Sequence, residues 1–156
     1  MALGQRAIAA LGGGRGGEVN LEEEGLRVRY RAEAADRVGC AVVGLRVEDL
    51  RAAARDADAL NAWAGRVAGR VTYLMEEIAV IEVDTAGESA LLRSAPPDRR
   101  GGARAYYEVV LRRPEVLTLT RYRYQNGDRE RTEIPCLLTL EVFERLVDDL
   151  AETMRG

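Results

Sequence analysis

The sequence predicts a two-layer α+β fold, in which helices cover one face of an antiparallel sheet. Two observations lead to this prediction. Short segments of strand-like alternation follow one another through tight turns, which is typical of antiparallel strands. Separate segments repeat apolar residues every three or four positions, as amphipathic helices do. Runs of adjacent strands with helices outside them indicate α+β rather than α/β architecture.

The chain has 156 residues, enough for one domain with a continuous core. Residues 1–17 are predicted to form a short helix, about Leu3 to Leu11, followed by a glycine-rich flexible joint. We expect residues 18–156 to form a single α+β domain. The acidic run at residues 22–24 is interpreted as solvated charge.

Residues 26–47 are predicted to form a hairpin. Between Leu26 and Ala32, apolar residues alternate strictly with Arg27, Arg29 and Arg31, which indicates a half-buried strand. Val38 to Val47 is apolar on both faces and is interpreted as a more interior strand. The position of the first strand in the sheet decides whether its arginines share a face with those described below.

A long central helix is predicted from Glu48 to about Gly69. Its apolar residues recur at steps of three and four, and the acidic residues at its start suit the helix dipole. Gly65 and Gly69 are attributed to a close helix–sheet contact or to the helix end. The same spacing continues through Val71, Leu74 and Ile78, so a longer helix is the alternative.

Five strands are predicted to form a meander over residues 72–135, which makes a sheet of about five to seven strands in all. Asn126-Gly127 predicts a two-residue type I′ turn. A C-terminal helix capped by Thr139 is expected to pack on the same face of the sheet as the central helix. Its predicted buried stripe is Phe143, Leu146, Val147, Leu150 and Met154.

The predicted turn places tyrosines and arginines on one face of the last hairpin. Its register pairs Tyr124 with Arg129 and Tyr122 with Arg131, a platform suited to stacking on bases or gripping an anionic partner. A second group surrounds the loop at residues 96–102 and suits a phosphate or carboxylate: Arg93, Arg99, Arg100 and Arg104. Solvated surface arginines are the preferred alternative for both groups.

The composition narrows the chemistry that the chain can perform. It contains no histidine and no lysine, since all 23 basic residues are arginine. The acid–base candidates are therefore carboxylates. Glu82 and Asp84 are predicted to share a strand face, and Glu76 joins them if the strand stays regular. Cys40 and Cys136 are interpreted as buried free thiols. No cofactor and no metal are expected.

The sequence therefore favours a non-enzymatic interaction or regulatory domain with an unidentified protein partner, and pairing into a homodimer is a natural extension. One alternative is a nucleic-acid or anionic-ligand binder, although the net charge of −3 argues against a dedicated binder of duplex nucleic acid. The other is a carboxylate-based enzyme without histidine, lysine or a transition metal. We expect no membrane span, no signal peptide and a cytoplasmic location.

Overall fold

The computed structural model describes residues 2–11, 16–51, 57–95, 98–100 and 102–155, with the backbone alone at 57 and 98–100. The described residues form three helices, α1 (Leu3–Ala9), α2 (Ala57–Arg70) and α3 (Leu140–Arg155). They also form ten strands: β1 (Gly17–Glu23), β2 (Leu26–Ala35), β3 (Gly39–Asp49), β4 (Glu77–Asp84), β5 (Ser89–Ala95), β6 (Asp98–Arg100), β7 (Ala103–Arg112), β8 (Val116–Gln125), β9 (Thr132–Ile134) and β10 (Cys136–Thr139). The predicted α+β class is confirmed.

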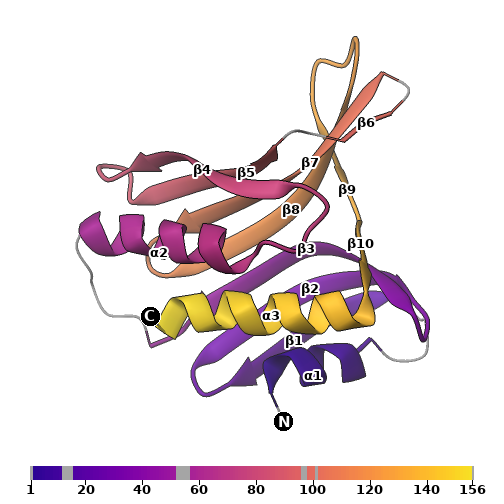
Figure 1. The fold of residues 1–156 in the computed structure, drawn as a ribbon. Coiled ribbons are helices and arrows are strands. Elements are labelled where there is room, and N and C mark those ends of the chain that lie inside the picture. The colour runs from indigo at the N-terminus through magenta and orange to yellow at the C-terminus, as the bar shows by residue number, and fades with distance from the viewer. Residues whose placement is uncertain (1, 12–15, 52–56, 96–97, 101, 156) are drawn as a thin grey trace.

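All the strand pairs are antiparallel, in the order β1-β2-β3-β8-β7-β5-β4. The sheet has an N-terminal lobe, β1–β3, and a C-terminal lobe built on β4, β5, β7 and β8 (Figure 1). β3 pairs with β8 only over Leu45–Glu48. Beyond that stretch the lobes diverge. The chain segment after the turn at Gln125–Asp128 pairs first with β8, as β9, and then with β3, as β10.

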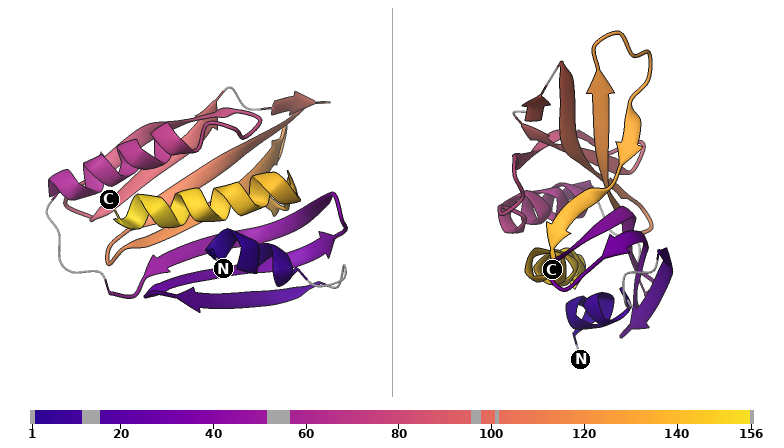
Figure 2. Two further views of the ribbon diagram at one scale, coloured as in Figure 1. Left: turned by 60° about the horizontal axis from the view of Figure 1, so that its bottom comes forward. Right: turned by 90° about the vertical axis from the view of Figure 1, so that its right-hand side faces the viewer.

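The three helices lie on the same face of the sheet, with α3 between α1 and α2 (Figure 2). The predicted buried stripe of α3 is confirmed in full, and the hydroxyl of Thr139 accepts a hydrogen bond from the Val142 amide at 3.1 Å. Trp63 of α2 is buried and donates to Thr153 of α3 at 3.1 Å. None of the described helices is long and apolar enough to cross a membrane.

The prediction of a long central helix from Glu48 is wrong. β3 continues through Asp49, and α2 begins only at Ala57, although it ends near Gly69 as predicted. The reason is tertiary: Asp49 donates its amide to the Glu115 carbonyl at 3.0 Å, and the β3–β8 ladder holds the preceding residues extended. The part of the predicted helix at residues 52–56 lies outside the described residues.

The predicted number of strands is also too low. β1 is a strand of the sheet, although its acidic end was interpreted as solvated charge, and its only inward apolar residues are Val19 and Leu21. The meander starts at Glu77 rather than at residue 72, because residues 72–76 pair with no described strand of the sheet. Leu74 and Glu76 are buried in this segment between α2 and β4. The predicted hairpin of residues 26–47 is confirmed as β2 and β3.

The predicted N-terminal helix is confirmed and docks on the domain. Leu3 and Ala7 of α1 are buried in the common core, and the Gly4 amide donates to Asp148 of α3 at 2.8 Å. The Tyr30 hydroxyl of β2 donates to the Ala7 carbonyl. A side chain at Gly4 would clash with the carbonyl of Glu144, so the close contact between α1 and α3 requires glycine at this position.

Gly65 offers a matched contrast, because it lies in the middle of α2 with no atom near the position of a Cβ. The attribution of Gly65 to a close helix–sheet contact is therefore wrong.

We expect Gly4→Ala to lower the free energy of unfolding by about 1–3 kcal/mol, as overpacking does. Gly65→Ala should raise it by about 0.5–1 kcal/mol through helix propensity. Urea unfolding of both variants tests this, and equal effects would contradict the α1–α3 contact.

Candidate binding surface

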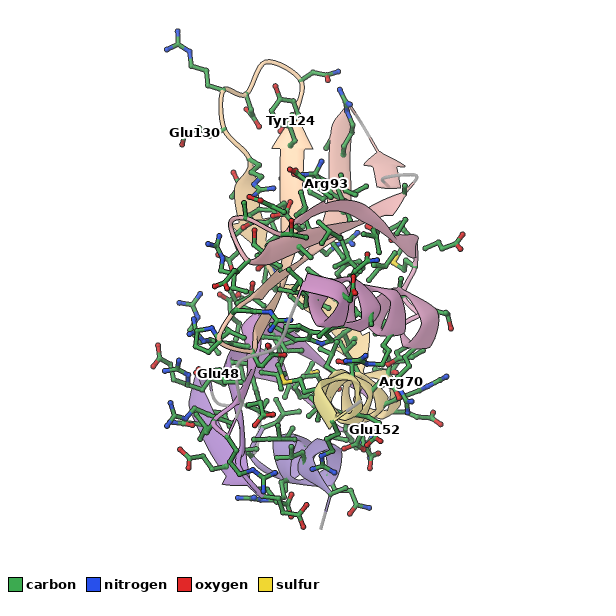
Figure 3. The ribbon with its side chains drawn as sticks, turned by 90° about the vertical axis from the view of Figure 1, so that its left-hand side faces the viewer. Glu48, Arg70, Arg93, Tyr124, Glu130 and Glu152 are labelled. Carbon is green, nitrogen blue, oxygen red and sulfur yellow. The ribbon has the colours of Figure 1, made fainter. Side chains whose placement is uncertain are left out.

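No described helix covers the second face of the sheet, which we call the open face (Figure 2). Cross-strand pairing identifies its residues, since partners in a ladder point the same way. One row runs across five strands through Arg29, Arg46, Thr118, Val110 and Leu91. The arginines of β2 therefore lie on the same sheet face as the tyrosines of β8. Figure 3 shows Glu48 on this face, and Arg70 and Glu152 on the helical side.

A tyrosine–arginine cluster lies on the open face of the C-terminal lobe, made of Arg93, Tyr106, Tyr122 and Arg131 around the buried carboxylate of Glu108. Arg131 donates to both carboxylate oxygens of Glu108, at 2.6 and 3.0 Å, and Arg93 donates to one of them at 3.0 Å. The guanidinium of Arg131 also lies 3.6 Å from the centroid of the Tyr122 ring. Each arginine is thus held by a carboxylate and an aromatic ring together.

The two tyrosines extend this arrangement along the hairpin. Tyr106 and Tyr122 are cross-strand partners with ring centroids 6.0 Å apart, and the Tyr106 hydroxyl accepts a hydrogen bond from Arg131 at 3.2 Å. Arg93 lies 5.1 Å from the centroid of Tyr106. Because every member has two or more partners, the cluster is an ordered surface before any ligand arrives.

The electrostatics of the cluster centre on Glu108, whose side chain is only 7% exposed. Burial raises its pKa, but the hydrogen bonds from Arg131 and then Arg93 outweigh burial and hold the pKa below its ordinary value. The carboxylate is therefore ionised at neutral pH. It neutralises one of the two positive charges that lie over it.

A second carboxylate plays the same part in the N-terminal lobe. Glu48 accepts hydrogen bonds from Arg29 and Arg46, each at 2.8 Å. Burial raises the pKa of Glu48, but the two arginines together lower it below its ordinary value. Arg27 pairs with Glu22 and Arg31 with Glu33, each at 2.9 Å. Most arginines of the open face are thus paired with carboxylates of the same chain.

The predicted contact between Tyr122 and Arg131 is confirmed, but the predicted register is wrong. Tyr122 pairs with Glu133 and Arg123 with Thr132, a shift of two residues from the predicted partners. The turn at Gln125–Asp128 is closed by the Asp128 amide, yet among its two central residues only Gly127 has a positive φ, whereas type I′ requires two. Residues 128–131 leave the ladder, and Arg131 turns towards Glu108.

The remaining predicted residues are only partly brought together. Tyr124 lies on the open face beside Arg104 and not beside Arg129. The guanidinium carbon of Arg104 is 5.9 Å from the centroid of the Tyr124 ring. Arg129 is exposed in the loop. Arg93, predicted to belong with the arginines around the loop at residues 96–102, instead joins the cluster from β5. The side chains of Arg99 and Arg100, in β6, lie outside the described part of the chain.

Two members of the cluster were not predicted, Tyr106 and Glu108. A signal for them existed, because Arg104, Tyr106 and Glu108 alternate with the inward residues of β7. A glutamate between apolar neighbours, as Glu108 is between Tyr107 and Val109, needs a partner when it is buried. Which arginines supply that partner depends on β5 and on the loop before β9, so spacing alone could not identify them.

The three candidate catalytic carboxylates do not converge. Glu82 and Asp84 face the open side of β4, opposite Leu91 and Ser89. Glu76 lies on the helical side, buried against Arg121 at 3.1 Å and next to Ser94. A shift in register between Val80 and Glu82 breaks the regular strand on which the shared face depended. Glu82 and Asp84 therefore share a face as predicted, but the prediction that Glu76 joins them is wrong.

Both cysteines are buried free thiols, as predicted. Burial raises the pKa of Cys40 to about 11 and that of Cys136 to about 12, so both remain protonated at neutral pH. Thiolate rather than thiol is the reactive form. Neither cysteine is therefore poised as a nucleophile in this fold.

Comparison of the chain with protein-family models, with curated protein sequences and with solved structures found no match. The geometry of the open face is accordingly the basis for interpreting the site.

The linkage between Glu108 and pH gives the first test of the cluster. Because folding lowers the pKa of Glu108, its stabilisation is present above the unfolded value of about 4.3 and is lost as pH falls through the folded value. We expect Glu108→Gln to lower the free energy of unfolding at pH 7 by about 1–3 kcal/mol, since it removes charged hydrogen bonds. The difference from the unsubstituted protein should shrink below about pH 4.

Glu33→Gln is the matched control, because Glu33 makes an exposed ion pair with Arg31. We expect it to change stability by less than about 1 kcal/mol. Urea unfolding from pH 3 to pH 8 measures both variants. A Glu108→Gln effect that stays constant over this range would contradict the charged role of Glu108.

Proposed function

We propose that this chain is a non-enzymatic interaction domain that binds a partner protein through the open face, with the tyrosine–arginine cluster at the centre of the contact. The ordered cluster around Glu108 is the observation that supports the proposal. Tyrosine and arginine are the residue types most enriched among the energetically dominant residues of protein interfaces. Their side chains are already held in place here, so binding would cost little side-chain entropy.

The pairing of the arginines favours a protein partner over nucleic acid. At Glu108 and again at Glu48, one carboxylate partly neutralises two guanidinium groups. A surface for nucleic acid gains affinity from unpaired cations that replace counterions on phosphates. A surface whose arginines are mostly paired and whose tyrosine rings are half-buried instead suits a partly apolar protein surface.

The middle of the open face agrees with this interpretation. Thr118, Val110 and Leu91 form a half-buried uncharged row between the charged groups of the two lobes. Uncharged side chains flanked by charged ones resemble the apolar centre and polar rim of a typical interface. Separation of Glu76 from Glu82 and Asp84 leaves the alternative of a carboxylate enzyme without support from the geometry.

Affinity capture from a lysate of the source organism tests the proposal, with Tyr122→Ala and Arg104→Glu as surface variants. Arg155→Glu on the helical side is the control for the charge reversal. We expect a protein that is retained at high salt by the unsubstituted chain and by Arg155→Glu, and is lost with Tyr122→Ala. The loss should be at least tenfold, since removing a central interface tyrosine costs about 2 kcal/mol or more.

Other outcomes assign the surface differently. Nucleic acid that is released as salt rises, and that depends on Tyr122, would contradict a protein partner. Light scattering on the purified protein separates self-association from a different partner, because a homodimer that uses this face would dissociate in the Tyr122→Ala variant. Retained proteins that are unaffected by Tyr122→Ala would contradict the proposed surface altogether.

A further inference from the structure

The free edge of β4 is a second surface that the tyrosine–arginine cluster does not explain. β4 (Glu77–Asp84) is the last strand in the order of the sheet, and among the described strands it pairs only with β5 (Figure 1). Its other edge therefore presents backbone N–H and C=O groups without a strand partner. Such an edge is a template for pairing with another chain unless it is protected.

Apolar side chains gather at this edge. Val80 is 40% exposed, Ile81 is 54% exposed, and Met75, just before the strand, is 69% exposed. In the described chain these are three of the six strongly exposed large apolar residues. Val80 pairs with the buried Leu92, so it points to the helical side, at the rim of the layer that contains α2.

Acidic side chains line the other side of the same edge. Glu77 pairs with Ala95, Glu82 with Leu91 and Asp84 with Ser89, which directs all three towards the open face. None of the three forms an ion pair with an arginine of the described residues. The outer strand at the opposite end of the sheet differs, since Glu22 of β1 pairs with Arg27 and Glu23 with Arg6. Three carboxylates without an arginine partner among the residues described thus lie along the β4 edge.

A second copy of the chain is a poor occupant for this edge. Two copies related by a two-fold axis would pair their β4 strands antiparallel, and Glu77 of one copy would then lie opposite or diagonal to Glu82 and Asp84 of the other. Like charges at such positions are destabilising. The same features favour a strand that carries the opposite charge.

We propose that the free edge of β4 binds an extended segment of a partner protein in which basic and apolar side chains alternate. Backbone hydrogen bonds to β4 would provide the common part of the affinity, as in other cases of strand addition. Basic side chains of the added strand face Glu77, Glu82 and Asp84, while its apolar side chains cover Val80 beside α2. Charge complementarity provides the selection for this partner. The proposal does not depend on the tyrosine–arginine cluster.

The test uses the full chain and a capped, fluorescein-labelled eight-residue peptide in which arginine and valine alternate. Fluorescence anisotropy at physiological salt should show saturable binding with a dissociation constant below about 1 mM. The same peptide with glutamate in place of arginine should not bind. A peptide N-methylated at alternate residues, so that one backbone edge is blocked, should bind at least tenfold more weakly.

Matched double variants locate the site. We expect Glu77→Lys with Glu82→Lys to weaken binding at least tenfold, since both side chains are exposed on β4. Glu130→Lys with Glu152→Lys makes the same change in net charge at exposed positions far from β4 and should weaken binding less than twofold (Figure 3). Circular dichroism checks that each variant is folded.

Several results would overturn the proposal. Failure of the unsubstituted chain to bind the basic peptide would overturn it. Equal losses of affinity in the two double variants would also overturn it, because they would indicate long-range attraction alone. Undiminished binding of the N-methylated peptide would exclude strand addition without requiring any variant. A Tyr122→Ala chain should bind the peptide normally, so a failure here is distinguishable from a failure of the proposed function.

Discussion

The short ladder between β3 and β8 is the constraint on which the rest of the structure depends. It pairs Leu45 with Leu119 and Val47 with Leu117, and these four side chains are almost completely buried. Each contributes about 1.5–3 kcal/mol through burial. The ladder joins two antiparallel units that would otherwise be separate sheets. It also keeps residues 45–48 extended, which places Glu48 on the open face beside the arginines of β2 rather than in a helix.

The charge that each surface of this sheet presents depends on whether its arginines and carboxylates are paired, rather than on how many there are. Buried Glu108 and half-buried Glu48 each hold two arginines of the open face, so part of the positive charge of a chain with 23 arginines is neutralised there. The edge at β4 shows the opposite arrangement, with carboxylates that lack arginine partners in the described chain beside exposed apolar side chains. The two proposed surfaces therefore differ in chemistry and select different partners. One suits a partly apolar protein face, and the other suits an extended basic strand.

The candidate site was predictable where it depends on neighbours in the sequence. Alternation within β8 was enough to place Tyr122 and Tyr124 on one face, and the predicted proximity of Arg131 to Tyr122 is found although the predicted register is wrong. Residue spacing could not reveal Glu108 as the centre, because its two arginines come from β5 and from a loop outside the ladder. Arg131 makes its bidentate contact with Glu108 in a structure where the register of β8 with β9 differs by two residues from the one that the turn motif predicts.

The sequence by itself determined the α+β class, the hairpin of residues 26–47 and the C-terminal helix, because alternation, turn residues and helical periodicity act over a few neighbouring positions. It also determined that the chain has no histidine and no lysine side chains. Only the tertiary structure decided the start of α2, the inclusion of β1 and the separation of Glu76 from Glu82. Those outcomes depend on strand pairing and burial between distant segments, and such contacts outweigh local preferences of about 1 kcal/mol or less per residue.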